Sequence, residues 1–449
     1  MPSWLDRLLR HRSAPLVLLI AVCAVSFGAR VFHIDIPNET HAGNGLIFDE
    51  RYYVNAARVM AGAPMAQGET YANAAPPGDD PNAEHPQLGK MIIALGIRVF
   101  GDNPVAWRFS AVIAGTAALL LLYWLVRVAG GSGWLALGAA ALAAVDNLWM
   151  VSGRIAVLDV YCLPFMLAGA AFYLRRQPIV AGILIGVGAC IKEFALYALL
   201  ALLLLELFRW IRAVLPSAGG WSLQLRRAVR PALLTLMTVA TFVSLLAVLD
   251  WLSTPYHDGH RVDQHQSALC DHALVWSGAC NHISFMNGYA AALRSPHGPQ
   301  GIASYPWQFW GNVEPIDYYT VTTTVRSGST VQSVEHVVAF RATINPVLLV
   351  TAWLAILLGL WWAVRRRDEM SLLVVAWILA TWLPAELFSL VDQRTTYLYY
   401  MVFTMPALYI AVARMLGMRV VPRWLVGVWV GLLLSTAAFL YPFRTFTGT

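Results

Sequence analysis

The stretch SAPLVLLIAVCAVSFGARVF, residues 13–32, holds a single charged residue, Arg30. Twenty residues in an α-helix are about 30 Å long, which matches the hydrocarbon thickness of a bilayer. The stretch therefore predicts a transmembrane helix. The whole chain has the same character, since 58% of its 449 residues are apolar and only 12% are charged, whereas a soluble domain carries about 25% charge. We expect one integral membrane unit over residues 1–449, an all-α polytopic protein.

Further apolar runs of spanning length follow along the chain. One more run, over 88–100, is too short to cross and is expected to lie along the membrane surface. The eleven predicted spans are 13–32, 104–126, 132–150, 156–174, 178–191, 194–211, 229–250, 345–364, 370–388, 396–413 and 423–442.

Positive charge assigns the two sides of these spans. Seventeen of the 31 Lys and Arg residues fall in the N-terminal segment and in every second connection after it. Because Lys and Arg accumulate in short cytoplasmic connections, this pattern predicts a cytoplasmic N-terminus. Two long extracytoplasmic loops follow, 33–103 and 251–344. The net charge of +6 then reflects topology and does not indicate nucleic-acid binding.

The second long loop contains Cys270 and Cys280, separated by nine residues that include Gly278. An extracytoplasmic compartment is usually oxidising, so the pair is predicted to form a disulfide. The other three cysteines lie in predicted spans and are expected to be core residues.

Residues 48–60, FDERYYVNAARVM, place Asp49 and Glu50 side by side just beyond the first span. Acids at a helix start are often no more than a favourable solvated turn. Here, however, further charged residues are predicted to lie at the same extracytoplasmic surface of the membrane. An isolated one is often only an anchor, but several on one face favour a shared site. The charged residues at this surface are Lys90 in EHPQLGK, Arg154 and Asp159 in SGRIAVLD, Lys192 in IKEF and Arg394 in VDQRTTYLYY.

This combination of charges indicates a type of chemistry. Cations at the membrane surface suit a phosphate held at headgroup level. A nearby carboxylate suits a general base acting on a hydroxyl. Together they predict group transfer from a lipid-phosphate donor, whose leaving phosphate Arg and Lys would stabilise. The sequence has no P-loop or dinucleotide-binding fingerprint.

Several motifs occur in a fixed order between about residues 45 and 410: FDERYY, EHPQLGK with WRFSA, SGRIAVLD after a DN pair, GVGACIKEFALY, SYPWQFW and QRTTYLYYMVFTMPAL. This ordered set resembles the dolichyl- or polyprenyl-phosphate-mannose protein O-mannosyltransferases, membrane glycosyltransferases of the GT-C class. The resemblance implies a GT-C fold with eleven spans. It also implies transfer of mannose from a polyprenyl-phosphate-mannose donor to Ser or Thr hydroxyls of secreted or membrane proteins. The loop 251–344 is too short for the MIR domain of eukaryotic members, so the resemblance implies a bacterial plasma-membrane form.

Roles for individual residues follow from the resemblance. Asp49 is implied to be the general base, and Glu50 to position the acceptor or support the base. No metal or other cofactor is implied. The donor pocket is implied to involve His85, Lys90, Arg154, Lys192 and Arg394, with Asp159 orienting neighbouring cations.

The acceptor side is less defined. Tyr305 and Trp307 in SYPWQFWGN, 304–312, are expected to form a platform for an acceptor chain, although aromatic side chains also collect at the headgroup level. Gln87 stands where the family usually has a second Pro. The segment DGHRVDQHQSALCDHALVWSGAC, 258–280, has no counterpart in the family.

Other functions remain open from the residues alone. A GT-C enzyme that moves a lipid-linked sugar to a lipid or polysaccharide would present similar base and phosphate sites. A transporter would place its polar residues near the bilayer midplane, which is mostly apolar here. Asp49, Glu50 and His85, or the loop histidines, form no common metal-ligand spacing. These histidines are His257, His260, His265, His272 and His282.

Overall fold

The computed structural model describes residues 11, 13–38, 45–214, 221–265, 267–327, 330–366 and 368–441, and it places no side chains within 213–227 and 321–339. The basic residues Arg7, Arg10, Arg12 and Arg367, which entered the topology prediction, lie outside the described residues.

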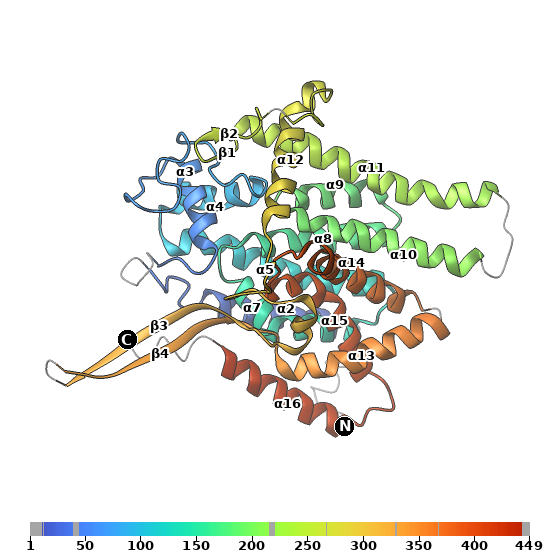
Figure 1. Cartoon of the computed structure of the whole chain (residues 1–449). Helices are drawn as coiled ribbons and strands as arrows, with labels where there is room; N and C mark the ends of the chain where they lie inside the picture. The colour runs from blue at the N-terminus through green and yellow to red at the C-terminus, as the bar shows by residue number, and fades with distance from the viewer. Residues whose placement is uncertain are drawn as a thin grey trace.

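Helices dominate the described residues and run mostly side by side through the body of the molecule (Figure 1). The helices, in chain order, are α2 (Ala14–Val31), α3 (Glu50–Ala61), α4 (Leu88–Phe100), α5 (Pro104–Val128), α6 (Gly133–Val145), α7 (Asn147–Ser152), α8 (Leu158–Leu174), α9 (Pro178–Ala189), α10 (Leu196–Val214), α11 (Trp221–Leu252), α12 (Ser277–Ala292), α13 (Pro346–Arg365), α14 (Glu369–Asp392), α15 (Met401–Leu416) and α16 (Arg423–Leu440). Short 3₁₀ turns are η2 (Glu193–Ala195), η3 (Leu274–Trp276), η4 (Pro306–Gly311) and η5 (Leu398–Tyr400).

Eight helical segments in the described part of the chain are long and apolar enough to cross a membrane. They comprise α2, α5, α10 with η2, the apolar part of α11, α13, α14, α15 with η5, and α16. Three shorter apolar helices, α6, α8 and α9, occupy the positions predicted for the third, fourth and fifth spans. The predicted helical membrane fold is confirmed, whereas helix length alone does not establish eleven crossings.

Proline and a polar cap mark the start of several of these helices. Pro104 and Pro346 each occupy the first helical position, where the missing N–H would have no partner. The preceding residues, Asn103 and Asn345, accept hydrogen bonds from backbone N–H groups of the first turn. These side chains satisfy donors that would otherwise be unpaired at the helix end.

Helix α9 packs very closely against α11. Gly182 and Gly186, one turn apart, lie on this face. A Cβ atom at Gly182 would lie 2.6 Å from the Met237 Cβ, and one at Gly186 would lie 2.7 Å from the Thr241 Cβ. Glycines four residues apart allow two membrane helices to approach at backbone distance. Because glycine has no side chain here, dispersion contacts between the helices replace side-chain interdigitation.

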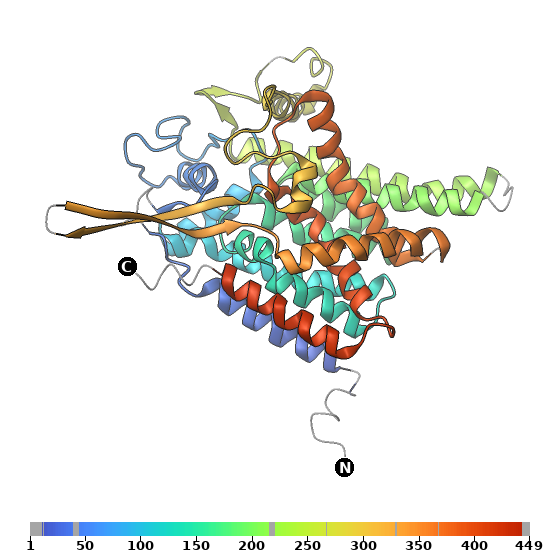
Figure 2. The same ribbon diagram turned by 60° about the horizontal axis from the view of Figure 1, so that its bottom comes forward.

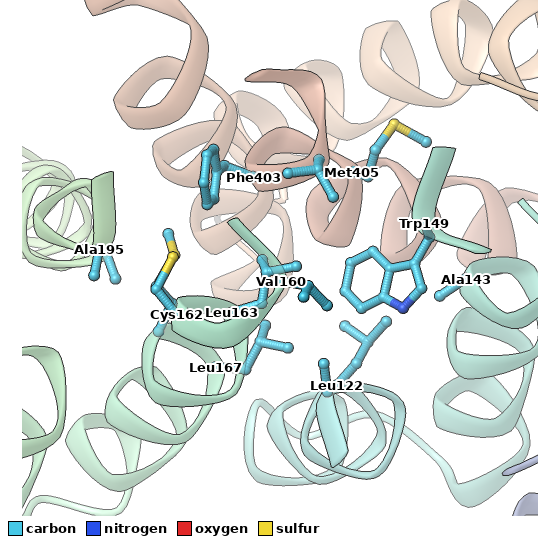
Figure 3. Close-up of a cluster of buried hydrophobic side chains, with 14 of the residues drawn as sticks. Leu122, Ala143, Trp149, Val160, Cys162, Leu163, Leu167, Ala195, Phe403 and Met405 are labelled. Carbon is cyan, nitrogen blue, oxygen red and sulfur yellow. The ribbon is translucent and has the colours of Figure 1, made fainter. Parts of the chain in front are cut away.

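The core lies where α5, α7, α8 and α15 meet (Figure 3). Trp149 of α7 is 1% exposed, and its ring contacts Tyr409 of α15 edge to face with 5.7 Å between centroids. Leu122, Leu163 and Phe403 fill the surrounding space. Between membrane helices the alternative to burial is lipid, so these large side chains stabilise the fold through close van der Waals packing.

The second long loop is more structured than predicted. It contains α12 and two antiparallel hairpins, β1 (Tyr256–His257) with β2 (His260–Arg261), and β3 (Ile316–Ser327) with β4 (Thr330–Ala342). The β3–β4 hairpin extends away from the helices in both views (Figures 1 and 2). A disulfide joins Cys270 to Cys280, with 5.6 Å between their Cα atoms.

A buried polar group ties the two long loops together. The His282 side chain of α12 contacts the Asp250 carboxylate of α11 at 2.8 Å through Nδ1 and the Ala83 carbonyl at 3.0 Å through Nε2. Gln87 donates to the same carboxylate at 2.6 Å. Gln87, where the family usually has Pro, therefore has a structural partner of its own.

Among the described residues, Glu50 and Arg108 form an ion pair in which both groups use all their hydrogen-bonding capacity. The guanidinium of Arg108 donates two bonds to Glu50, of 2.8 and 2.9 Å, and further bonds to the carbonyls of Ile34, Pro37 and Gly45. Glu50 also accepts from the backbone N–H groups of Ile47 and Ala156. Both side chains are at most 1% exposed. The pair thus fastens the start of α3 to α5 and to the α7–α8 connection.

We predict that Glu50→Gln destabilises the whole protein. The amide keeps the shape of the carboxylate, but it leaves a buried guanidinium without its countercharge, which typically costs about 3–5 kcal/mol. Thermal unfolding of the detergent-solubilised protein measures the effect. Glu314→Gln, at an exposed acid of the second loop, is the matched control and should leave the unfolding temperature unchanged. Equal unfolding temperatures for the two variants would contradict the structural role of Glu50.

Candidate active site

A cavity of about 740 Å³ opens at one end of the helix bundle. Four segments that are distant in the sequence line it, and most of its side chains are aromatic or charged. The lining residues include Phe48, Asp49, Arg51, Tyr52, Tyr53, Tyr71, Asn82, Glu84 and His85 from the first loop; Lys192, Glu193 and Phe194 from the α9–α10 connection; Tyr289 and Tyr318 from the second loop; and Arg394, Tyr397, Tyr399 and Tyr400 from the α14–α15 connection.

Asp49 immediately precedes α3 and lines this cavity. Its side chain does not cap the helix, and the described residues provide its carboxylate with no hydrogen-bond donor. Removal from water raises the pKa of Asp49 to about 6, although the positive charge of Lys192 opposes the shift. A carboxylate with a pKa near the working pH is suited to accept a proton.

The residue before Asp49 has an unusual backbone. Phe48 has φ 52°, a left-handed conformation that a bulky side chain rarely adopts. Its ring stacks on Tyr318 with 4.4 Å between centroids and meets Tyr399 edge to face at 5.7 Å. These contacts hold the strained turn. Such strain is concentrated at functional sites, because the surrounding packing must compensate for it. Here it directs Asp49 into the cavity.

Two further acids line the cavity, but both have partners. Glu193 contacts His85 Nδ1 at 2.9 Å, and Glu84 accepts a hydrogen bond from Asn82. Asp49 is therefore the lining acid best able to take a proton from a substrate.

Besides Arg51 beside the base, two cations line the same cavity from different connections between helices. Lys192 donates to both carboxylate oxygens of Asp159 at 2.9 Å, and its ammonium lies 5.1 Å from the centre of the Phe194 ring. Asp159, the predicted supporting residue, holds this lysine in place. Arg394 follows the left-handed residue Gln393 at the end of α14, and its Nη1 is buried without a hydrogen-bond partner among the described residues. A buried guanidinium nitrogen that lines a cavity and lacks an acceptor fits an anionic ligand.

Three of the predicted site residues do not line the cavity. Glu50 does not line the cavity, since it pairs with Arg108 in the interior. Lys90 is fully buried and pairs with Asp80 at 2.5 Å while donating to the carbonyl of His85 at 2.8 Å, so it organises the loop that carries His85. Arg154, 1% exposed, donates to the His33 carbonyl at 2.6 Å and lies over the Phe340 ring.

Tyr305 and Trp307 also lie outside the lining of the cavity. Their rings stack on each other with 4.2 Å between centroids, and Trp307 is 43% exposed. Trp310 anchors the same turn to the helices, because its ring packs against Trp353 of α13 and Trp382 of α14. The turn thus has a buried half and an exposed half, and the acceptor role of its exposed half stays a prediction.

The sequence prediction missed most of the aromatic lining. Tyr52 and Tyr53 are part of FDERYY, and Tyr397, Tyr399 and Tyr400 are part of QRTTYLYY. The signal was present as clustered tyrosines beside the charged residues, but only the fold shows that both clusters face one cavity. Among the described residues, no group of three or more His, Cys, Asp or Glu side chains could hold a metal ion.

The family described as dolichyl-phosphate-mannose-protein mannosyltransferase matches residues 20–253, over half of the chain. The chain belongs to this family. Its relatives include the polyprenol-phosphate-mannose–protein mannosyltransferase of Mycolicibacterium smegmatis, 24% identical over 463 residues, which cover 92% of this chain and 86% of that protein. The enzyme of the same name from Mycobacterium tuberculosis is also 24% identical, with coverage of 92% and 85%. The resemblance read from the motifs is confirmed.

Solved structures show that this family member has the GT-C fold. The Saccharomyces cerevisiae protein O-mannosyltransferase Pmt1–Pmt2 complex bound to the sugar donor matches with a TM-score of 0.69 at 10% identity, over 95% of this chain and 89% of that chain. ArnT from Cupriavidus metallidurans bound to undecaprenyl phosphate matches with a TM-score of 0.53 at 18% identity, over 94% and 63% of the two chains. At these identities, the likeness concerns the fold alone.

The raised pKa of Asp49 predicts an acidic limb in the pH profile. The base must be deprotonated to act, so kcat/KM should increase with pH up to about 6 and level off above it. Below the pKa, activity should fall about tenfold per pH unit. Initial rates of mannosyl transfer between pH 4.5 and 8 measure this profile. A midpoint near 4, the usual value for an exposed aspartate, would contradict the buried environment of the base.

Arg394 and Arg154 should respond differently to substitution. Arg394→Gln removes a cation from the cavity, so we predict a rise of at least tenfold in the KM for the lipid donor with little loss of stability. Arg154→Gln should instead lower the unfolding temperature, because its side chain bonds to the backbone in the interior. Donor titrations and thermal unfolding of both variants make the comparison. A donor-specific defect in Arg154→Gln alone would reverse this assignment.

Proposed function

We propose that this protein transfers mannose from a polyprenyl-phosphate-mannose donor to Ser or Thr hydroxyls of proteins. Family membership supports the reaction, and relatives that match over nearly their whole length bear the name of this activity. The single observation that carries the assignment of residues is the Asp49 carboxylate, which has no hydrogen-bond partner among the described residues and lies in a cavity that also contains Lys192 and Arg394.

The reaction follows from this arrangement. The hydroxyl oxygen of Ser or Thr attacks the anomeric carbon of the mannosyl group, and a new C–O bond forms. Asp49 accepts the hydroxyl proton as this bond forms. The bond between the anomeric carbon and the phosphate oxygen breaks, and its electron pair leaves with the polyprenyl phosphate. Arg394 and Lys192 stabilise the charge that develops on this leaving group.

Further polar residues orient the side chains that line the cavity. Asp159 orients Lys192 through two hydrogen bonds, and Glu193 orients His85. His85 lines the cavity together with its partner Glu193 and is suited to contact a sugar hydroxyl. The tyrosines surround these charges with apolar ring faces, which lower the local dielectric and strengthen each electrostatic contact.

The acceptor is an extended protein segment in this proposal. The stacked Tyr305 and Trp307 present an exposed surface on the second loop. Aromatic rings supply contact area at a small cost in conformational entropy. The segment passes over this surface before its hydroxyl reaches Asp49.

The proposed orientation places the cavity outside the cell. The distribution of Lys and Arg in the sequence supports a cytoplasmic N-terminus. Asp49, at the start of α3, and Arg394, just after α14, then lie on the extracytoplasmic side of a bacterial plasma membrane. The donor is already activated, so transfer at this face needs no cytoplasmic energy source.

Asp49→Asn should abolish turnover without unfolding the protein. Loss of a general base typically lowers the rate by about 10²–10⁴-fold, and the side chain lines a cavity where no packing contact depends on its charge. Labelled polyprenyl-phosphate-mannose and a panel of Ser and Thr peptides measure the rate, and donor binding should persist. Asp258→Asn, at an acid with an 86% exposed side chain, is the control. Turnover within threefold of the wild type in Asp49→Asn would overturn the assignment of the base.

The same assay tests the class of acceptor. Label that appears in peptides supports protein mannosylation. Label that appears only in lipid or polysaccharide fractions would support a different GT-C transferase with the same donor site.

A further inference from the structure

A second cavity, of about 720 Å³, lies at the other end of the helix bundle. Helices α8, α10 and α14 each run from one cavity to the other. Helix α10 follows Phe194 of the first cavity and carries Arg212 of the second. Helix α8 begins at Leu158, beside the supporting Asp159, and ends at Leu174 in the second cavity. Helix α14 begins at Glu369 in the second cavity and ends just before Arg394. Its 24 residues span about 36 Å. The two cavities therefore lie at opposite surfaces of the membrane.

The second cavity is rich in arginine. Four arginines and two glutamates line it: Arg176, Arg209, Arg212, Arg230, Glu206 and Glu369. The two glutamates are already paired. Arg209 contacts Glu206 at 2.7 Å and Glu369 at 2.8 Å, and Arg212 contacts Glu369 at 2.9 Å. Arg176 and Arg230 have no carboxylate partner among the described residues.

Arg230 is held in position without being neutralised. Its guanidinium lies 4.9 Å over the Tyr173 ring and donates one hydrogen bond, of 2.9 Å, to the Tyr173 carbonyl. Its Nε is buried and has no hydrogen-bond partner in the described part of the protein. A guanidinium that is stacked and partly bonded has already lost much of its freedom, so it can bind an anion with little further ordering.

Arg176 adds a second cation from the end of α8. Its φ is 63°, the left-handed conformation that glycine or asparagine usually supplies after a helix. Its N–H donates to the Tyr173 carbonyl, the same oxygen that Arg230 contacts. A long charged side chain at this position is exposed, and the turn places it next to Arg230 at the mouth of the cavity.

The remaining wall is apolar. Leu203, Leu207 and Trp210 of α10 line the cavity, and Leu207 and Trp210 remain 44% and 43% exposed. Tryptophan is enriched where the headgroups meet the hydrocarbon. A ligand of this cavity therefore meets cations at one end and aliphatic and aromatic side chains along the other, which is the polarity of a phospholipid.

We propose that this second cavity binds an anionic membrane phospholipid, with Arg176 and Arg230 on its phosphate and Leu203, Leu207 and Trp210 along its acyl chains. Basic pockets between membrane helices are suited to such headgroups. The planar guanidinium matches two phosphate oxygens at once. Free inorganic phosphate would use the cations but leave the apolar wall uncovered. The bound lipid would connect α8, α10, α11 and α14, all of which contribute lining residues.

Lipid binding to the purified full-length protein tests this proposal. The protein is placed in nanodiscs of phosphatidylcholine with increasing phosphatidylglycerol, and its unfolding temperature is measured. Lipid retained after detergent extraction is counted by native mass spectrometry. Wild-type protein should retain phosphatidylglycerol in preference to phosphatidylcholine and unfold at a higher temperature as its fraction rises. Inorganic phosphate alone should give neither effect.

Two variants and one control localise the binding. Arg230→Gln and Arg176→Asn should each weaken retention of phosphatidylglycerol about fivefold. Asparagine accepts the left-handed backbone, so Arg176→Asn removes the charge without adding strain. Arg176→Asn also keeps the test valid if Arg230→Gln fails to fold. Arg365→Gln is the control, because this exposed arginine lies at the same end of the bundle but not in the cavity.

Three results would overturn the proposal: unchanged retention in both cavity variants, equal retention of phosphatidylcholine, or an equal thermal shift with inorganic phosphate. Because the site is remote from Asp49, these results leave the proposed mannosyl transfer unaffected.

Discussion

The buried pair of Glu50 and Arg108 is the interaction on which the active end of the molecule depends. Each group has all its hydrogen-bonding capacity used, with Arg108 reaching three backbone carbonyls and Glu50 two backbone N–H groups. An ion pair in a membrane protein interior is stable only with such saturation, since desolvation of each charge costs several kcal/mol. The pair fixes the first turn of α3, and that turn directs the adjacent Asp49 into the cavity.

The charged residues fall into two sets. Some form buried ion pairs that stabilise the fold, and others line the cavity where the reaction is proposed to occur. Two buried ion pairs stabilise the loops, namely Lys90 with Asp80 and Arg108 with Glu50. In the cavity, Asp49 and one nitrogen of Arg394 have no hydrogen-bond partner among the described residues. Unsatisfied groups at a cavity cost stability when the site is empty, and a substrate that satisfies them recovers that cost. The same contrast occurs at the opposite surface, where the described part of the chain offers no hydrogen-bond partner to Arg230 Nε.

The helices that connect these two surfaces differ in how they pack. Glycines bring α9 to backbone distance from α11, whereas large rings fill the space among α7, α8 and α15 (Figure 3). Packed cores transmit a displacement because they do not deform continuously. Helices α8, α10 and α14 carry groups for both cavities, so their spacing determines the geometry at each end.

Hydropathy and charge in the sequence determined the membrane class and the positions of the apolar helices, because a bilayer excludes unpaired backbone and charge wherever the chain crosses it. The ordered motifs determined the family. The direction of each side chain was decided only by the tertiary structure. Asp49 and Glu50 are neighbours, yet successive residues at a helix start point about 100° apart, so one faces the cavity and the other the interior. The sequence predicted Arg154 and Lys90 as site residues, but both are buried within the protein. The packing of distant segments decides which charged side chains line a cavity and which form buried contacts.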